Sequence, residues 1–383
     1  MSSEEAKVEA TAPRLRRPGR WGRVVIAAAI AIVVIVAGSL AYAQWVKATE
    51  GPTLVVYTYA SLLGGSCGSG GAASGVFANF SSEYHVTIDV ECPSGNLVDT
   101  LEAQAGSPGA DLVVGLDEIT GPEAESLGLL VNYTPPGLAD VNTSLVAALS
   151  PDHYVTPYEY GYLGIDYADS FFNATGGAIA NSSFPDFATN SSWADQLLYE
   201  DPSIDITGEE FLAWEVLYYE TVLHEDWTGF WTSVLPHAHD SSSWDEAFKD
   251  FGSANGNLVV SYTTDPASAA YYPTGFGFNT TVASLNGTLY GWETIYGAGI
   301  VKGSTHLTLD EEFIDYLLSG SVQSAIPLNE WEYPANSTVA LPAVYSDLIP
   351  PSSIHALNAA ITPSELAVDI TGWITTWETL AGE

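Results

Sequence analysis

The chain has 383 residues, of which 46% are hydrophobic, so it can form one large or two medium domains and is not a wholly disordered chain. Nine Lys and Arg residues stand against 47 Asp and Glu residues, giving a formal net charge of −38. Six of the nine bases precede residue 24, and the acidic remainder excludes binding to nucleic acid through phosphates. The chain is poor in basic residues but has no unusual excess of acidic ones, which favours adaptation to an acidic habitat. Adaptation to high salt is the alternative.

The N-terminal segment is predicted to anchor the chain. Residues 24–46 include no charged residue and are long enough to cross a bilayer, and bases crowd the side before them. We therefore expect a cytoplasmic tail at 1–23, a single-pass transmembrane anchor at 24–46 and an extracellular binding domain at the cell membrane. The alternative is a signal peptide cleaved near Ala41–Ala43.

Two further features fit an extracellular location. Cys67 and Cys92 both follow the predicted anchor, where a disulfide can persist, although their spacing does not say whether they pair. Nine Asn-x-Ser/Thr sequons also follow it, which favours a glycoprotein. The sequons begin at Asn79, Asn132, Asn142, Asn173, Asn181, Asn190, Asn279, Asn286 and Asn336.

The segments after residue 52 alternate between strand and helix patterns. Apolar runs predict strands at 53–56, 86–90 and 110–115, and helical patterns separate them. The helices are expected at about 76–84, 97–105 and 122–127. This order is typical of an α/β protein with a mainly parallel sheet.

The second half continues the pattern with more helices. The segment 154–167 is rich in β-formers and is expected to pass between two lobes, whereas 173–190 is polar and is expected at the surface. Helices are predicted at 208–222, 225–235, 243–251 and 309–318, the last with Thr308 as its N-cap. Thr362, Pro363 and Glu365 predict a capping box at the start of the last helix.

Three strands end in polar and aromatic residues. The stretch NLVVSYTTDPA (257–267) passes from an apolar strand to Ser261, Tyr262 and two threonines. In 53–61 and 111–117 an apolar run is likewise followed by polar or aromatic residues. Side chains at strand ends of an α/β sheet meet in a cleft. We therefore expect a cleft formed by these three ends.

These segments resemble, in the same order, the thiamine-binding subfamily of solute-binding proteins of ABC transporters. The matching words are VYTYAS (56–61), ADLVVGLDE (110–118), PYEYGYLGIDY (157–167), YEDP (199–202), SWDEAF (243–248), NLVVSYTTDPA, QSAIPLNEWEYP (323–334) and the Trp-x₃-Trp of Trp373 and Trp377. The resemblance covers nearly all of 53–383.

The resemblance implies a two-lobed periplasmic-binding-protein type II fold with an interlobe cleft. One lobe would comprise 53–154 and 296–343 and the other 155–295, with 344–383 packing across both. The implied function is an extracellular component of an ABC importer that captures thiamine, or a related small cation, and delivers it to a permease and its ATPase. A monomer without a cofactor or a metal is expected, and no enzymatic activity.

Thiamine is flat and cationic, so aromatic faces and carboxylates complement it. By resemblance, Tyr59, Trp244, Tyr262 and Trp331 form the aromatic walls of the pocket; packing in the core is the competing interpretation of each. The full set of predicted ligand-binding residues is Tyr59, Ser61, Asp117, Glu159, Asp205, Trp244, Tyr262 and Trp331.

The chain also departs from the family pattern. Ala60 replaces a common aspartate, and Ser268 replaces an aromatic residue, with Tyr271 and Tyr272 one turn later. After YEDP, where relatives often carry residues suited to phosphate, this chain has Asp205, which would repel one although it can equally be a plain N-cap. We therefore expect unphosphorylated thiamine or another small cation.

Other functions leave weaker signals. Tyr271-Tyr272 resembles the tandem tyrosines of ferric-binding proteins of this fold class, which makes ferric iron the alternative ligand. His237-Ala238-His239-Asp240 offers only half of a metal site. An enzyme is disfavoured because no catalytic motif is present and Asp117 with Glu159 fits ligand hydrogen bonding or surface acids better than acid–base catalysis. A structural surface-layer protein fits the sequons but not the lobes.

Overall fold

The structure, a computed structural model, describes residue 38 and residues 51–382 apart from 66, 68–71, 255 and 273–274. The chain divides into two units, Met1–Pro52 and Thr53–Glu383. The predicted anchor at 24–46 lies outside the described residues except for Gly38. Within the part that is described, no helix is long and apolar enough to cross a membrane.

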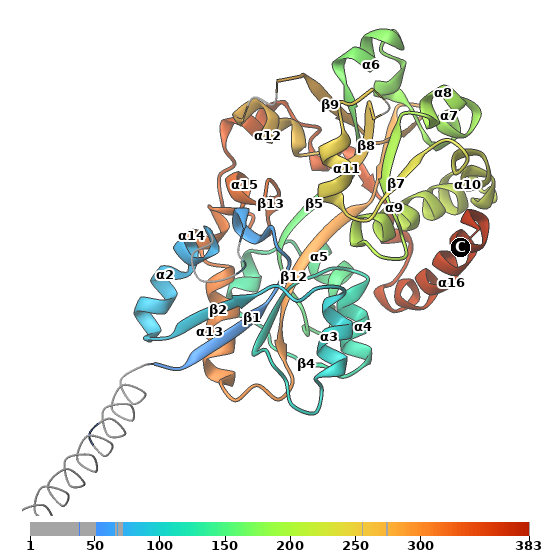
Figure 1. Ribbon diagram of the computed structural model, residues 1–383. Coiled ribbons are helices and arrows are strands. Elements are labelled where there is room, and N and C mark those ends of the chain that lie inside the picture. Colours follow the sequence, from blue (N-terminus) through green and yellow to red (C-terminus); the bar gives the residue numbers. More distant parts are fainter. Residues whose placement is uncertain are drawn as a thin grey trace, which may run out of the picture. The chain divides into compact units, whose positions relative to one another are not determined.

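Most strands of the second unit join one large mixed sheet (Figure 1). In spatial order its main path comprises β2 (Thr87–Glu91), β1 (Thr53–Tyr57), β3 (Leu112–Leu116), β12 (Glu293–Val301), β5 (Thr156–Ala168), β8 (Leu258–Tyr262), β6 (Leu197–Glu200) and β7 (His239–Ser241). The strands β4 (Leu130–Val131), β9 (Phe278–Thr281) and β13 (Tyr333–Pro334) pair beside this path. A separate small sheet comprises β10 (Ala283–Leu285), β11 (Thr288–Gly291) and β14 (Ile354–Ala356).

The long strand β5 joins the two halves of the large sheet. Its first half pairs antiparallel with β12, and its second half, from Leu163 onward, pairs antiparallel with β8 and β9. The outer pairs β1–β2, β1–β3, β6–β7 and β6–β8 are parallel, as the alternating sequence predicts. One continuous strand therefore carries the chain from one half to the other, which supports the two predicted lobes; their boundaries at 154/155 and 295/296 stay a prediction.

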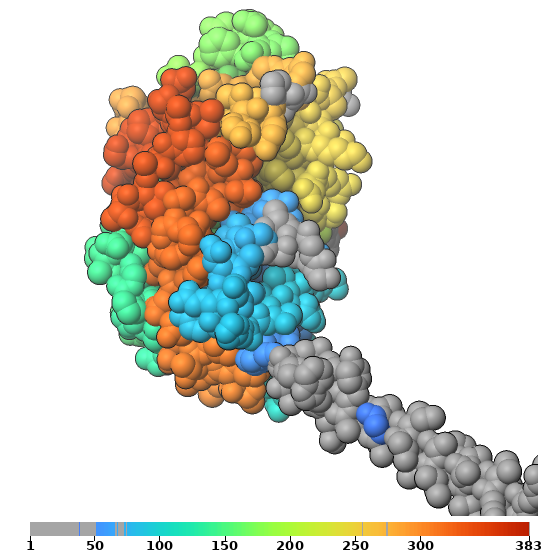
Figure 2. Space-filling model, turned by 90° about the vertical axis from the view of Figure 1, so that its left-hand side faces the viewer, coloured from blue at the N-terminus to red at the C-terminus, as the bar shows by residue number. Residues whose placement is uncertain are grey.

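Helices cover both halves of the sheet. The first half carries α2 (Ala72–Tyr84), α3 (Leu97–Ala103), α4 (Thr120–Ser126), α5 (Thr143–Leu149), α13 (Leu307–Leu317), α14 (Gly320–Gln323) and α15 (Ile326–Asn329). The second half carries α6 (Asp169–Ala174), α7 (Phe184–Thr189), α8 (Ser191–Ala194), α9 (Ile206–Leu217), α10 (Thr228–Val234), α11 (Trp244–Asp250) and α12 (Asp265–Tyr271). A π-helical turn at Tyr218–Leu223 extends α9. Figure 2 shows the orange to red segments of the last third of the chain beside both the blue and the yellow segments.

The C-terminal helix α16 (Pro363–Ala381) begins as predicted. Thr362 and Glu365 form a reciprocal capping box, and Pro363 occupies the first turn. The apolar stripe of α16 packs on α9 and α10 and also reaches α4 of the first half. This contact with both halves supports the prediction that the C-terminal segment packs across the lobes.

Three local predictions were wrong. The segment 173–190 is not a surface excursion, because it buries Ile179, Phe184 and Phe187 in the core of the second half. Thr308 is not an N-cap, since α13 begins one residue earlier. Asn336 is 6% exposed and donates a hydrogen bond to the carbonyl of Leu318, so this sequon is inaccessible in the folded chain.

Candidate functional site

A cavity of about 880 Å³ lies among the strand ends that the sequence singled out. The segment after β1 contributes Thr58 to Ser61, and the end of β8 contributes Tyr262. Each strand is buried where it pairs and then leaves the sheet, so the following side chains turn into open space. Residues from β5, from the start of α9 and from the α15–β13 connection complete the wall.

Aromatic side chains line the cavity. Tyr59 contacts Tyr296 with ring centroids 5.8 Å apart, and the hydroxyls of Tyr262 and Tyr296 lie 3.0 Å apart. Trp244 lies 6.5 Å from Tyr262 between ring centroids and stacks on Phe248 at 4.9 Å. All four predicted aromatic residues line this one cavity, together with Tyr296 and Phe248, which were not predicted.

A buried hydrogen-bond chain fixes the position of Trp244. Its indole N–H donates to Oγ of Ser261 at 2.9 Å, and Ser261 donates in turn to the carboxylate of Asp265. The backbone N–H of Tyr262 donates to the same carboxylate at 3.1 Å. Burial, opposed by these hydrogen bonds, raises the pKa of Asp265 to about 6. The end of β8 and the first turn of α12 thus hold Trp244 and Tyr262 in place at the cavity wall.

Trp331 enters the cavity from the α15–β13 connection in a left-handed backbone conformation, with φ of 61°. Tyr271 and Tyr272 pack on it, with ring centroids 5.6 and 5.8 Å from its ring. A non-glycine residue in this conformation is held there by its surroundings. The indole is thus clamped at the cavity by two tyrosines from the end of α12.

Seven acidic side chains line the cavity. They are Asp99, Glu159, Asp205, Glu209, Asp265, Glu330 and Glu332. The described part of the chain contains two Lys residues and no Arg, and neither Lys249 nor Lys302 lines the cavity. The described wall of the cavity therefore offers acidic groups and no Lys or Arg side chain to balance their charge when they ionise.

The hydroxyl of Tyr59 connects several of these groups. It lies 2.7 Å from the hydroxyl of Tyr158, 3.0 Å from Oε1 of Glu159 and 3.2 Å from Oε2 of Glu330. Burial raises the pKa of Glu159 to about 8 despite hydrogen bonds from both tyrosines. Burial and then the charge of Glu159 raise the pKa values of Glu330 and Glu332 well above the usual range.

The other predicted polar residues divide into two groups. Ser61 and Asp205 line the cavity, and Asp205 also caps α9 by accepting from the N–H of Thr207 at 2.9 Å. Asp117 does not line it: its Oδ1 accepts from the N–H groups of Ile119 and Thr120 at the start of α4. This carboxylate is fully buried in a local capping role, so its predicted contact with a ligand has no support in the geometry.

Most of the acids that line the cavity were not among the predicted residues, although the sequence contains one signal for them. Glu330 and Glu332 flank Trp331 in the word QSAIPLNEWEYP, so two acids beside a predicted aromatic wall could have been chosen with it. Glu209 comes shortly after the predicted Asp205 and lies in the first turn of α9. Asp265 comes shortly after the predicted Tyr262 and lies in the first turn of α12. Tyr296 had no such signal, because it lies within β12 and reaches the cavity through the pairing of β12 with β5.

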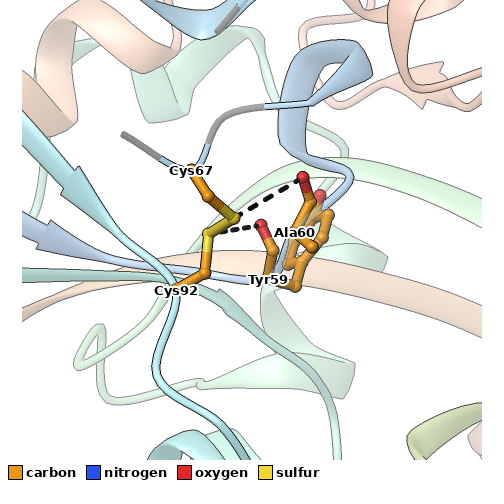
Figure 3. Close-up of a disulfide and its surroundings, with 4 residues drawn as sticks. All are labelled: Tyr59, Ala60, Cys67 and Cys92. Atoms are coloured by element: carbon orange, nitrogen blue, oxygen red, sulfur yellow. Dashed lines mark hydrogen bonds between the residues drawn. A yellow bond between two sulfur atoms is a disulfide. The ribbon is translucent and has the colours of Figure 1, made fainter. Parts of the chain in front are cut away.

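A disulfide joins Cys67 to Cys92 beside this site, with Cα atoms 5.6 Å apart (Figure 3). The Sγ atom of Cys92 lies 3.6 Å from the carbonyl oxygen of Tyr59, and that of Cys67 lies 4.0 Å from the carbonyl oxygen of Ala60. Since disulfide sulfurs carry no proton, these are packing contacts. The disulfide therefore braces the backbone that presents Tyr59.

The arrangement gives little support to ferric iron. Tyr271 and Tyr272 are 48% and 59% exposed and do not line the cavity. No group of three or more His, Cys, Asp or Glu side chains among the described residues could hold a metal ion. His237 pairs instead with Asp195 at 2.9 Å on the surface.

Comparisons with known proteins give a consistent result. The chain is 26% identical over 328 residues to the thiamine-binding periplasmic protein of Escherichia coli (strain K12), covering 85% of this chain and 93% of that relative. It is 24% identical over 339 residues to the protein of the same description from Brucella suis, covering 85% and 91%. No family model matches the chain.

Solved structures agree on the fold. A periplasmic thiamin binding protein superposes with a TM-score of 0.71 at 23% identity, covering 86% of this chain and 96% of its own. An iron-bound protein from Pseudomonas aeruginosa superposes with a TM-score of 0.67 at 16% identity, covering 86% and 99%. The chain has the two-lobed α/β fold of periplasmic binding proteins and is similar, over most of its length, to the thiamine-binding proteins of that fold.

Proposed function

We propose that the chain is the solute-binding component of an ABC importer and that it captures thiamine. The observation that carries this proposal is the composition of the cavity wall: six aromatic rings and seven acids, with no Lys or Arg among the described residues that line it. Thiamine joins an aminopyrimidine to a cationic thiazolium, and both rings are flat. Aromatic faces attract such a cation by about 0.5 to 2 kcal/mol each, more when water is excluded.

The relatives of the chain are periplasmic binding proteins, which supports a transport role rather than an enzymatic one. Ligand capture in this fold is a closure of two lobes about connecting strands. Here β5 and β12 would act as those strands, because they join the two halves of the sheet. A closed, loaded chain would then present thiamine to a permease that works with its ATPase.

The charges favour unphosphorylated thiamine. A phosphate would be attracted to the N-terminus of a helix, but the N-terminus of α9 at the cavity is already capped by Asp205. Glu209 lies in the first turn of the same helix and Asp99 on α3, and both line the cavity. Burial raises the pKa of Glu209 to about 8, so a dianionic ester at this helix end would meet acidic groups, ionised or protonated, and no compensating base.

The proposed role in import also requires the binding unit to lie outside the cytoplasm. A membrane anchor at 24–46 with the N-terminus in the cytoplasm would keep the binding unit outside the cell, close to its permease. A monomer suffices for this task.

Calorimetric titration of the full chain with thiamine, its mono- and diphosphate and Fe³⁺ tests the proposal. We expect saturable heat with thiamine and at least about tenfold weaker binding of the diphosphate, since each 1.4 kcal/mol of repulsion is tenfold in affinity. Heat with Fe³⁺ alone would overturn the ligand assignment. Equal affinity for thiamine and its diphosphate would contradict the preference for the unphosphorylated form.

A further inference from the structure

Three carboxyl groups form a cluster at the inner wall of the cavity. Glu159 lies on β5. Glu330 and Glu332 lie on the connection from α15 to β13, and β13 pairs with β5. Glu332 packs against Gly161, where a Cβ atom would overlap its carboxylate. The absence of a side chain at Gly161 thus lets the third carboxyl group approach the other two.

The cluster has fewer donors than its oxygen atoms require. The hydroxyl of Tyr59 has one hydrogen, yet its oxygen lies within hydrogen-bond distance of Tyr158, Glu159 and Glu330. Oε2 of Glu159, Oε1 of Glu330 and Oε2 of Glu332 are shielded from solvent and have no hydrogen-bond partner among the described residues. A buried carboxylate oxygen without a donor is strongly unfavourable, and a proton on the carboxyl group itself removes this cost.

The groups that face the cluster are all acidic or phenolic. Asp265 from α12 and Glu210 from α9 add negative charge, and Tyr59 and Tyr158 add hydroxyls. The charge of Glu332 also acts on four further tyrosines, namely Tyr160, Tyr262, Tyr333 and Tyr345. In the part of the chain that the structure describes, no basic side chain opposes them, so only protons or a bound cation can neutralise the cluster.

We propose that Glu159, Glu330 and Glu332 form a proton-binding site that is occupied in the empty cavity, and that a cationic ligand expels a proton from it on binding. The exchange is balanced: a carboxyl group becomes a carboxylate beside the ligand cation, and its proton passes to solvent. The identity of the ligand rests on the proposed function, but the proton site itself does not.

The direction of the pH dependence follows from the acidity of the cluster. Burial places the pKa of Glu159 at about 8 in the empty cavity, and a cation within about 4–6 Å lowers the pKa of a carboxyl group by about 1 to 3. At a pH between the pKa of the empty site and the lower pKa of the loaded site, the empty site is protonated and the loaded site is not. Affinity therefore rises with pH by up to about tenfold per pH unit and levels off above about pH 8. Acid releases the ligand.

Two measurements on the full chain test this inference. Infrared spectroscopy of the free chain at pH 7 reports the C=O stretch of protonated carboxyl groups, which we expect to weaken in Glu330→Gln and not in Glu225→Gln, an exposed acid outside the cavity. Calorimetry with thiamine at pH 7 in buffers of different ionisation enthalpy counts released protons. We expect about half to one proton per thiamine in the wild type and in Glu225→Gln, and less than half of that value in Glu330→Gln.

The outcomes separate the two proposals. Absence of the protonated carboxyl band in the free chain, or thiamine binding with no proton release and no pH dependence, overturns the proton site. A band that responds to Glu330→Gln while thiamine gives no heat overturns thiamine as the ligand and supports the proton site.

Discussion

Raising the pH from 5 to 8 is expected to destabilise the folded chain, because buried carboxyl groups must then ionise without a basic partner. Glu159 is 1% exposed and Asp265 is 7% exposed. Burial raises the pKa of Glu159 from 4.5 to about 8 and the pKa of Asp265 from 3.8 to about 6. The folded state therefore keeps protons that the unfolded chain loses above about pH 4, and stability falls as the pH rises.

The magnitude follows from the interval over which the two states differ in protonation. Each pH unit in which only the unfolded carboxyl is ionised costs about 1.4 kcal/mol. For Glu159 the interval from pH 5 to 8 spans almost three such units, or about 3 kcal/mol after partial titration at the ends, and for Asp265 about 1 kcal/mol. The sum of about 4 kcal/mol is a large part of the 5–15 kcal/mol typical of a folded domain.

Urea denaturation of the full chain at pH 5, 6, 7 and 8, at constant ionic strength and followed by tryptophan fluorescence, measures this loss. In Glu159→Gln the side chain cannot ionise, so the decline in unfolding free energy should shrink by about 3 kcal/mol, whereas Glu225→Gln should keep the wild-type decline. Equal or greater stability of the wild type at pH 8 than at pH 5 would refute the reasoning. So would an unchanged decline in Glu159→Gln.

Three further predictions follow from the cavity and its supports. Trp331→Ala should weaken thiamine binding by about tenfold to a hundredfold with the fold intact, whereas Trp373→Ala, on α16 outside the cavity, should leave the calorimetric affinity unchanged. Gly161→Ala should cost about 1–3 kcal/mol, and combining it with Glu332→Ala in a double-mutant cycle should recover at least about 1 kcal/mol; strict additivity would contradict the overlap. Cys67→Ser opens a link between residues 25 apart, so urea denaturation should show a loss of about 3 kcal/mol, and wild-type stability would count against the disulfide.

Several features could be predicted from the sequence because they depend on neighbouring residues. The capping box of α16 joins Thr362 and Glu365, three residues apart, and the structure contains it as predicted. The apolar runs that end in Tyr59 and Tyr262 likewise carry both the strand and its exit in one short segment. The fold class followed from the alternation of such segments together with the resemblance to a known family.

The prediction of the candidate site was incomplete for the opposite reason. Asp117 was chosen because it follows a strand, but nearby N–H groups at the start of α4 bind its carboxylate and keep it out of the cavity. Tyr296 and Phe248 were missed because an aromatic residue in a strand or helix has the same local pattern whether it faces a core or a cavity. The pairing of Cys67 with Cys92 likewise depends on the tertiary structure, because their spacing along the chain does not decide it.

What the sequence determined by itself was therefore the set of local elements and the strongly acidic body, and the resemblance to a known family added the four aromatic residues at the cavity. Only the tertiary structure decided that the hydroxyl of Tyr59 meets Glu159 and Glu330, which lie 100 and 271 residues away along the chain. The physical reason is that capping and strand formation are satisfied by residues within one turn or strand. The protonation of a carboxyl group depends instead on every charge and donor that the fold brings around it.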